Sequence, residues 1–214
     1  MARNDPFTPD ELAGPAELAG ALARLDAEPA VSLPLLGTRI RRRLIGATTR
    51  LPYRSAIPVV GAGANAVRQD FELCMAIPAR SLLRAFAATL EALLNAALDR
   101  LEPQPLARPL DHPLRLNDVI VQRYPKGSFG ITAHRDHVRY QDLVALVTLS
   151  GTARFCLCDD RAGRGARELP CPPGHLLLLR APGFGGRRDR PFHFLDRIAR
   201  PRLSLGLRHD ARAT

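Results

Sequence analysis

The sequence has no tryptophan, and aromatic residues make up only 5% of its 214 residues. Enzymes that turn a base out of a nucleic acid generally stack it on aromatic side chains, so such a partner is disfavoured. Lysine is nearly absent as well, because Lys126 is the only one among 31 basic residues. An excess of arginine, alanine and leucine is typical of GC-rich coding sequences. The net charge of +10 is therefore only a weak indication of a nucleic-acid partner.

Long hydrophobic runs are also missing. Runs such as GHLLLL (174–179) are far shorter than the roughly 20 residues that span a bilayer. The first twelve residues, MARNDPFTPDEL, carry acidic groups and no apolar segment of the kind found in a secretory signal. Four cysteines are too few for a disulfide framework in a chain of this length. We therefore expect a cytoplasmic protein with reduced thiols and no membrane partner.

Three stretches in the first half have helical patterns, at residues 8–28, 35–50 and 79–101. The third is the clearest, because its leucines recur at spacings of three and four. Residues 51–78 contain two short strand candidates, AIPVV and DFELCM, and residues 102–114 form a proline-rich loop.

Local signals suggest where the first two helices begin and end. Thr8 is a candidate N-cap, followed by Pro9 at the first helical position. Gly14-Pro15 is expected to interrupt the first helix, and Gly46 is expected to end the second. The basic run RIRRRL (39–44) is interpreted as a solvated helix face rather than a binding patch.

From about residue 116 the pattern changes to short strand-like runs separated by turns. The runs are NDVIVQRY, LVALVTL, RFCLC, HLLLLRA and PRLSLGLR. Such spacing favours an antiparallel sandwich or jelly roll. We therefore predict an α+β protein in which N-terminal helices buttress a jelly-roll core, all within one compact domain.

The motif AHRDH contains the first candidate functional residues. His134 and Asp136 are two positions apart, so on an extended strand they share a face. One imidazole and one carboxylate need a third ligand to complete a 2-His-1-carboxylate triad, which binds non-haem Fe(II) and leaves positions open. The H-x-D triplet alone is weak evidence for a metal site, since charged surface turns often contain the same residues.

The third ligand is expected to be His193, with His175 as the rival. His193 is favoured because Arg202 and Ser204 follow it on a predicted strand. Arg208 shares their face, because residues an even number of positions apart on a strand point to the same side. A guanidinium group can grip a carboxylate through two parallel hydrogen bonds. No comparable basic pair follows His175 at that interval.

The order H-x-D, distal histidine and R-x-S resembles the Fe(II)/2-oxoglutarate-dependent oxygenases, over roughly residues 75–210. The resemblance implies a double-stranded β-helix (jelly-roll) core at residues 111–214, supported by a helical region with short strands at residues 1–110. It implies that His134, Asp136 and His193 bind iron. It also implies that the 2-oxoglutarate contacts come from a further set of side chains, namely Arg202, Ser204, Arg208 and Tyr124.

The resemblance further implies Fe(II), 2-oxoglutarate and O2 as cofactor and co-substrates, and an oxygenase that hydroxylates a small molecule or a protein side chain. The first alternative is an AlkB-like demethylase of alkylated nucleic acid, suggested by Arg208, although Ser204 and Gly206 depart from the R-x-N-x-T-x-R motif of that branch. The second alternative is a non-catalytic β-sandwich binding module. His137 is interpreted as a turn residue or as a neighbour of the metal or substrate.

Two other features allow more than one interpretation. Cys156, Cys158, Cys171 and His175 resemble a zinc site, but side chains two apart on a flat strand are too far separated for tetrahedral zinc, so buried thiols are favoured. The segment GFGGRRDRP (183–191) is either a lid over the substrate or an ordinary loop. Residues 1–70 match no known pattern, and the sequence does not reveal the oligomeric state.

Overall fold

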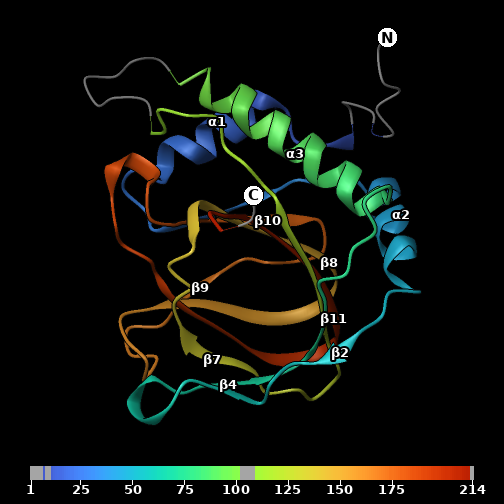
Figure 1. The fold of residues 1–214 in the computed structure, drawn as a ribbon, viewed down its shortest axis with the longest axis vertical. Helices are drawn as coiled ribbons and strands as arrows, with labels where there is room; N and C mark the ends of the chain where they lie inside the picture. The colour runs from blue at the N-terminus through green and yellow to red at the C-terminus, as the bar shows by residue number, and fades with distance from the viewer. Residues whose placement is uncertain (1–6, 8–10, 102–108, 213–214) are drawn as a thin grey trace.

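The computed structural model describes residues 7, 11–101 and 109–212. In these ranges, three α-helices and eleven strands form an α+β arrangement, with all three α-helices in the first half of the chain (Figure 1). The helices are α1 (Pro15–Arg24), α2 (Thr38–Thr48) and α3 (Leu82–Leu98). The strands are β1 (Ala30–Pro34), β2 (Arg54–Ser55), β3 (Val59–Val60), β4 (Val67–Asp70), β5 (Glu72–Cys74), β6 (Asp118–Tyr124), β7 (Gly130–His134), β8 (Tyr140–Cys158), β9 (Arg167–Leu169), β10 (His175–Arg180) and β11 (Phe192–Asp210).

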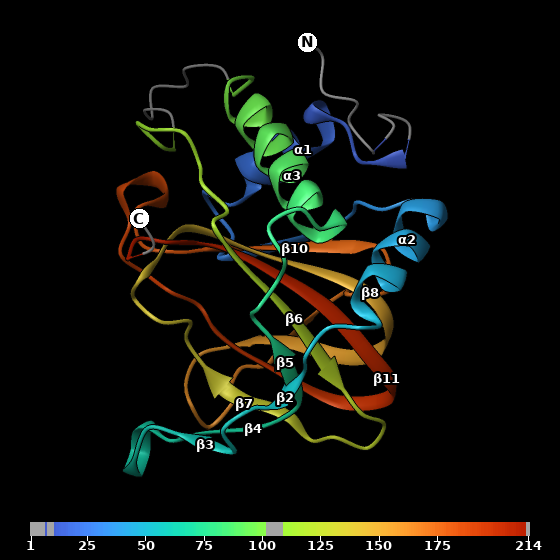
Figure 2. The same ribbon diagram turned by 45° about the vertical axis from the view of Figure 1, so that its right-hand side comes forward.

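Two long strands, β8 and β11, build the double-stranded β-helix core. Each has 19 residues and bends, so that its two halves pair with different neighbours. One half of each contributes to the layer β1-β10-β8-β11-β6-β5-β2. The other half pairs β8 with β9, and β11 with β7, which continues to β4 and β3. The predicted jelly roll is confirmed, and its two layers face each other (Figure 2).

The three helices lie on one side of the core, against the larger layer (Figures 1 and 2). Leucines of α1 and α3, among them Leu22 and Leu90, are fully buried with Val147 and Leu205 of the sheet in one hydrophobic cluster. Burying each such side chain contributes about 1.5–3 kcal/mol relative to leaving it exposed. The helices therefore stabilise the outer face of the sheet and leave the space between the layers for the site.

The helix boundaries differ from those expected. Gly14-Pro15 does not interrupt the first helix but begins it, because Gly14 is the N-cap, Pro15 occupies the first turn and Glu17 accepts a hydrogen bond from the Gly14 amide at 2.7 Å. The expected cap at Thr8 lies outside the described residues. Gly46 does not end α2, which continues to Thr48. The helix around Gly46 tolerates a glycine because tertiary packing of Ile40 and Leu44 holds it.

Two of the predicted strands form one bent strand, and another is part of a longer bent strand. LVALVTL and RFCLC belong to β8, and PRLSLGLR belongs to the same strand, β11, as His193. Gly151 makes the bend of β8 with φ 81°, and a Cβ atom there would lie 2.1 Å from the Pro201 carbonyl oxygen. A glycine inside a strand often marks a bend, and here it lets one strand serve both layers.

Replacing Gly151 by alanine is expected to lower the free energy of unfolding by about 2–5 kcal/mol, from a strained positive φ and the collision with Pro201. Gly46→Ala is the matched control: a Cβ there meets nothing within 4 Å, and the substitution is expected to stabilise the protein by up to about 1 kcal/mol. Urea denaturation measures the free energy of unfolding of both variants. Equal effects of the two substitutions would contradict the strain assigned to Gly151.

The N-terminal region also supplies strands to the core. β1 pairs with β10, β4 with β7 and β5 with β6. Residues 30–74 therefore contribute strands to both layers, in addition to the helix expected at residues 35–50. No helix within the described ranges combines the length and apolar character needed to cross a membrane.

Candidate active site

Three side chains from distant parts of the chain converge between the layers. His134 ends β7 and lies directly opposite His193, the second residue of β11. Asp136 lies two residues beyond the end of β7, so the expectation that it shares a strand face with His134 is wrong. Arg190 fixes the loop instead, because its Nη1 donates to the Asp136 carbonyl at 2.6 Å. One ligand atom from each of the three lies within 4.8 Å of the others.

Both imidazole rings are oriented by their own backbone. The Nδ1 atom of His134 donates to the Thr132 carbonyl at 2.9 Å, and that of His193 donates to the Pro191 carbonyl at 3.1 Å. This tautomer leaves the Nε2 lone pair of each ring free, and His193 Nε2 lies 3.7 Å from Asp136 Oδ2. Such a hydrogen bond to the second nitrogen is the usual way in which a protein orients a metal-binding histidine.

The electrostatics of the site favour a neutral His134 ring and a charged Asp136 carboxylate. Burial and the neighbouring His193 lower the pKa of His134 to about 4. Burial alone would raise the pKa of Asp136, but Arg208 and the two histidines outweigh it and hold this pKa below the usual value. At neutral pH His134 therefore presents a nitrogen lone pair and Asp136 a negative oxygen donor, which suits a divalent cation.

The cavity beside the histidines is lined by all four side chains predicted to bind 2-oxoglutarate. They are Tyr124, Arg202, Ser204 and Arg208, and both histidines line it with them. Arg202 lies opposite Tyr124 in the strand register and donates from Nη2 to Thr148 Oγ1 at 2.8 Å. Its Nε and the Nη1 of Arg208 are buried without a hydrogen-bond partner among the described residues. Buried donors of this kind fit an anionic ligand.

Tyr124 and Gly206 complete the polar end of this cavity. Burial raises the pKa of Tyr124 to about 12, so its hydroxyl stays protonated and is able to donate a hydrogen bond. Gly206 falls between Ser204 and Arg208 on one face, and a Cβ there would lie 2.7 Å from Arg208 Nη1. The glycine that departs from the AlkB-like motif therefore makes room for the arginine.

Other residues that line or support the cavity were not found from the sequence. Thr148 of β8 bonds to Arg202, Gln122 of β6 lies opposite Ser204, and Phe155 stacks on His193 with ring centroids 5.5 Å apart. Strand parity could have identified Gln122, which is two residues before Tyr124. Thr148 and Phe155 required the pairing of β8 with β11, which no local motif reveals.

The rival histidine and the cysteines lie elsewhere. His175 begins β10, and its Nδ1 is 3.1 Å from Ser32 Oγ. His137 is exposed, and its Nδ1 accepts from the Arg139 amide in a turn. Cys156, Cys158 and Cys171 are free and buried, and no three-ligand group in the described part of the chain includes them.

The segment 183–191 is held at several points. Phe184 is buried in the main core, Asp189 pairs with Arg180 at 2.8 Å, and Arg187 pairs with Asp26 at 3.2 Å. Together with the bond from Arg190 to Asp136, these contacts favour a fixed support of the site over a mobile lid.

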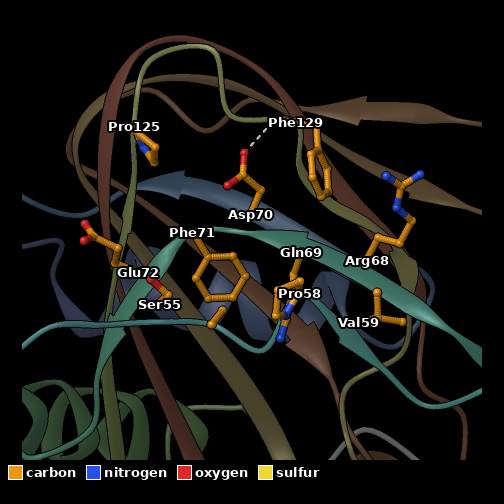
Figure 3. Close-up of a pocket in the computed structure, with 11 residues that line it drawn as sticks. Ser55, Pro58, Val59, Arg68, Gln69, Asp70, Phe71, Glu72, Pro125 and Phe129 are labelled. Atoms are coloured by element: carbon orange, nitrogen blue, oxygen red, sulfur yellow. Dashed lines mark hydrogen bonds between the residues drawn. The ribbon is translucent and has the colours of Figure 1, made fainter.

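A separate groove of about 580 Å³ lies beside the short strands (Figure 3). It is formed by residues 55–72 together with Pro125 and Phe129, and Phe129 is 45% exposed. Asp70 holds the turn in place by accepting from the Phe129 amide at 3.3 Å. None of the seven candidate site residues lines this groove, so it is distinct from the cavity between the layers.

Comparisons with known proteins identify the fold. No family model and no curated protein matches the sequence. Among solved structures, a prolyl-4-hydroxylase of Pseudomonas putida has a TM-score of 0.62 at 16% identity, covering 89% of this chain and 97% of that chain. A prolyl hydroxylase of Trichoplax adhaerens, in complex with a hypoxia inducible factor peptide fragment, has a TM-score of 0.63 at 11% identity, covering 94% of both chains. OsALKBH1 has a TM-score of 0.54 at 15% identity, covering 84% of this chain and 97% of that chain.

At these identities the likeness concerns the fold. The chain has the double-stranded β-helix fold of these solved structures.

Proposed function

We propose that the protein is an Fe(II)- and 2-oxoglutarate-dependent oxygenase. Its iron ligands are His134, Asp136 and His193. The observation that carries the proposal is that this His-Asp-His group adjoins a cavity in which buried arginine donors lack partners. A binding module would have no need for the His-Asp-His group. The buried unpaired donors, which cost about 1–3 kcal/mol each, are explained by an anionic co-substrate.

Each side chain has a distinct part in this proposal. Arg202 grips the distal carboxylate of 2-oxoglutarate with its guanidinium group, and Ser204 and the protonated Tyr124 donate hydrogen bonds beside it. Arg208, whose Nε lies 3.5 Å from Asp136 Oδ1, balances the charge of that carboxylate and lies close enough to steady the co-substrate. When bound, iron with 2-oxoglutarate and O2 supplies the oxidising power that hydroxylates a substrate C–H bond. Apolar neighbours such as Leu146 and Leu195 help to exclude water from the cavity.

The proposed substrate is a small molecule or a protein side chain. Two of the similar structures are prolyl hydroxylases, which supports a side-chain substrate. The likeness to OsALKBH1 keeps demethylation of nucleic acid as the second candidate. Release of formaldehyde from methylated single-stranded DNA would favour the second candidate over the first.

Anaerobic titration of metal-free protein tests the proposal before any substrate is known. A weak visible absorption band is expected only when Fe(II) and 2-oxoglutarate are both present, followed by succinate release on admitting air. A band with Fe(II) alone, or no band and no succinate under any order of addition, would contradict the proposal and favour a binding module.

A further inference from the structure

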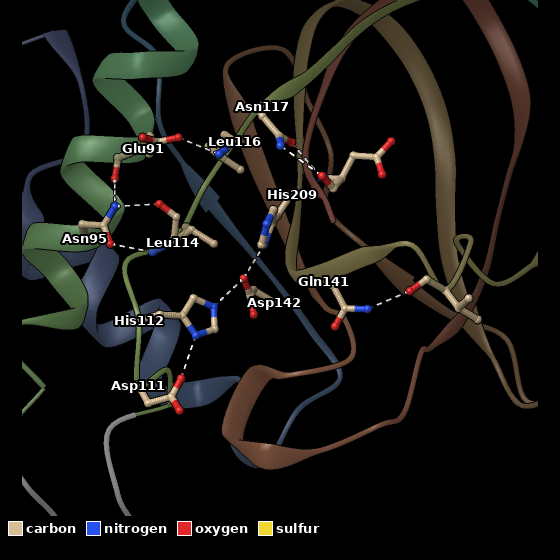
Figure 4. Close-up of polar contacts among 12 residues, drawn as sticks. Glu91, Asn95, Asp111, His112, Leu114, Leu116, Asn117, Gln141, Asp142 and His209 are labelled. Atoms are coloured by element: carbon tan, nitrogen blue, oxygen red, sulfur yellow. Dashed lines mark hydrogen bonds and ion pairs between the residues drawn. The ribbon is translucent and has the colours of Figure 1, made fainter. Parts of the chain in front are cut away.

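A second group of metal-ligating side chains lies outside the cavity, at His112, Asp142 and His209 (Figure 4). Asp142 Oδ2 is 3.1 Å from His112 Nε2 and 2.7 Å from His209 Nδ1. One ligand atom from each residue lies within 4.8 Å of the others. It is the only group of this kind, besides the proposed iron ligands, within the described ranges.

The three residues come from three separate segments. His112 lies between α3 and β6, Asp142 is near the start of β8, and His209 is near the end of β11. Asp142 is held by its backbone, since its amide donates to the Pro182 carbonyl at 2.8 Å and its carbonyl accepts from the Ala181 amide at 3.0 Å. Its φ of 64° is unusual for a residue other than glycine, and such strain is often found at functional sites.

The orientation of His112 is an independent sign of a metal site. Its Nδ1 donates to Asp111 Oδ1 at 2.7 Å, which directs Nε2 towards Asp142. A histidine placed between a carboxylate and a metal is a recurrent arrangement, because the carboxylate fixes the ring and raises its basicity. Asn95 holds the same segment through two hydrogen bonds with the backbone of Leu114, at 2.8 and 3.0 Å (Figure 4).

Charge and access also suit a cation. The Asp142 side chain is only 2% exposed, so its negative charge requires positive compensation. The His112 side chain is 47% exposed, which gives an ion a route to the site and leaves room for a water ligand.

We propose that His112, Asp142 and His209 form a second divalent-metal site of the zinc type. Zinc bonds of about 2.0–2.2 Å place tetrahedral ligand atoms roughly 3.3–3.6 Å apart. The observed separations of 2.7 and 3.1 Å are shorter, so the side chains would move apart by less than about 1 Å to admit the ion. An ion bound here would join the segment after α3 to the ends of β8 and β11, so its role is structural. The proposal does not depend on the oxygenase function.

The test uses His193→Ala as the background, which removes one ligand of the other group. Metal-free protein is dialysed against micromolar Zn²⁺ and its zinc content is measured by mass spectrometry. We expect one zinc per chain in His193→Ala and none in His193→Ala/His112→Gln. Zinc at 100-fold excess over its dissociation constant should raise the melting temperature of the background variant by roughly 5–10 °C.

Two further variants keep the test decisive. His137→Gln changes an exposed histidine in a turn, and in the same background it should leave zinc binding intact. Asp111→Asn, at a side chain that is 97% exposed, should fold normally and weaken zinc binding about 10–100-fold. If the background variant binds no zinc, or if zinc persists unchanged in the His112→Gln and Asp111→Asn variants, the trio is a hydrogen-bonded clamp and the proposal is overturned.

Discussion

Replacing His193 by alanine is expected to weaken Fe(II) binding at least about 100-fold and to abolish 2-oxoglutarate turnover. The substitution removes one of three donors, and the remaining two do not hold a divalent ion tightly. His193 is fixed by the hydrogen bond from its Nδ1 to the Pro191 carbonyl. Among the described residues, only the two histidines form a metal-ligand group with Asp136, so no other side chain is placed to replace His193. Anaerobic Fe(II) titration and succinate release measure the two effects separately.

His175→Ala is the matched control for this experiment. Both histidines begin or nearly begin a strand, and both are bonded through Nδ1, but His175 faces Ser32 rather than the cavity. We expect the His175 variant to bind iron as the unmodified protein does. If it lost iron while the His193 variant retained it, the ligand assignment would be wrong, whatever the effect on stability.

The sequence was informative wherever a function needs neighbouring residues on one strand. Arg202, Ser204 and Arg208 were predicted to share a face because the side chains of a strand alternate. The structure shows that all three line one cavity. The same reasoning failed for Asp136, since β7 ends at His134. There a backbone contact from Arg190, 54 residues away, sets the position of the loop.

The group formed by His112, Asp142 and His209 could not be predicted from local sequence patterns, for a related reason. His112 is 30 residues from Asp142, and Asp142 is 67 residues from His209. Their meeting depends on the packing of the segment after α3 against the ends of β8 and β11, which is a property of the whole fold. The bend in β8 was missed because a glycine in a strand pattern signals either a turn or a bend. The bend in β11 was missed because no glycine marks it: where its register with β8 shifts, the positive φ of 51° falls on Arg197.

Arg202→Ala is expected to raise the 2-oxoglutarate concentration needed for half-maximal turnover by about 100–1000-fold, while Fe(II) binding stays within a few-fold of normal. Two charge-assisted hydrogen bonds to a carboxylate are together worth roughly 3–4 kcal/mol, and this sets the expected size of the effect. The 2-oxoglutarate requirement of Arg202→Lys should lie between those of the unmodified protein and Arg202→Ala, because an ammonium group keeps the charge but lacks the planar fork. Steady-state succinate release against 2-oxoglutarate concentration measures all three proteins.

The stability of these variants separates co-substrate binding from folding. Arg202 is 4% exposed, has Thr148 as its one hydrogen-bond partner in the described structure and leaves Nε unpaired, so removing its buried charge should not lower the melting temperature. Arg200→Ala, two positions earlier on the same strand but exposed, should change neither property. An Arg202→Ala variant that unfolds at lower temperature yet keeps its 2-oxoglutarate requirement would show that this guanidinium group supports the sheet and does not bind the co-substrate.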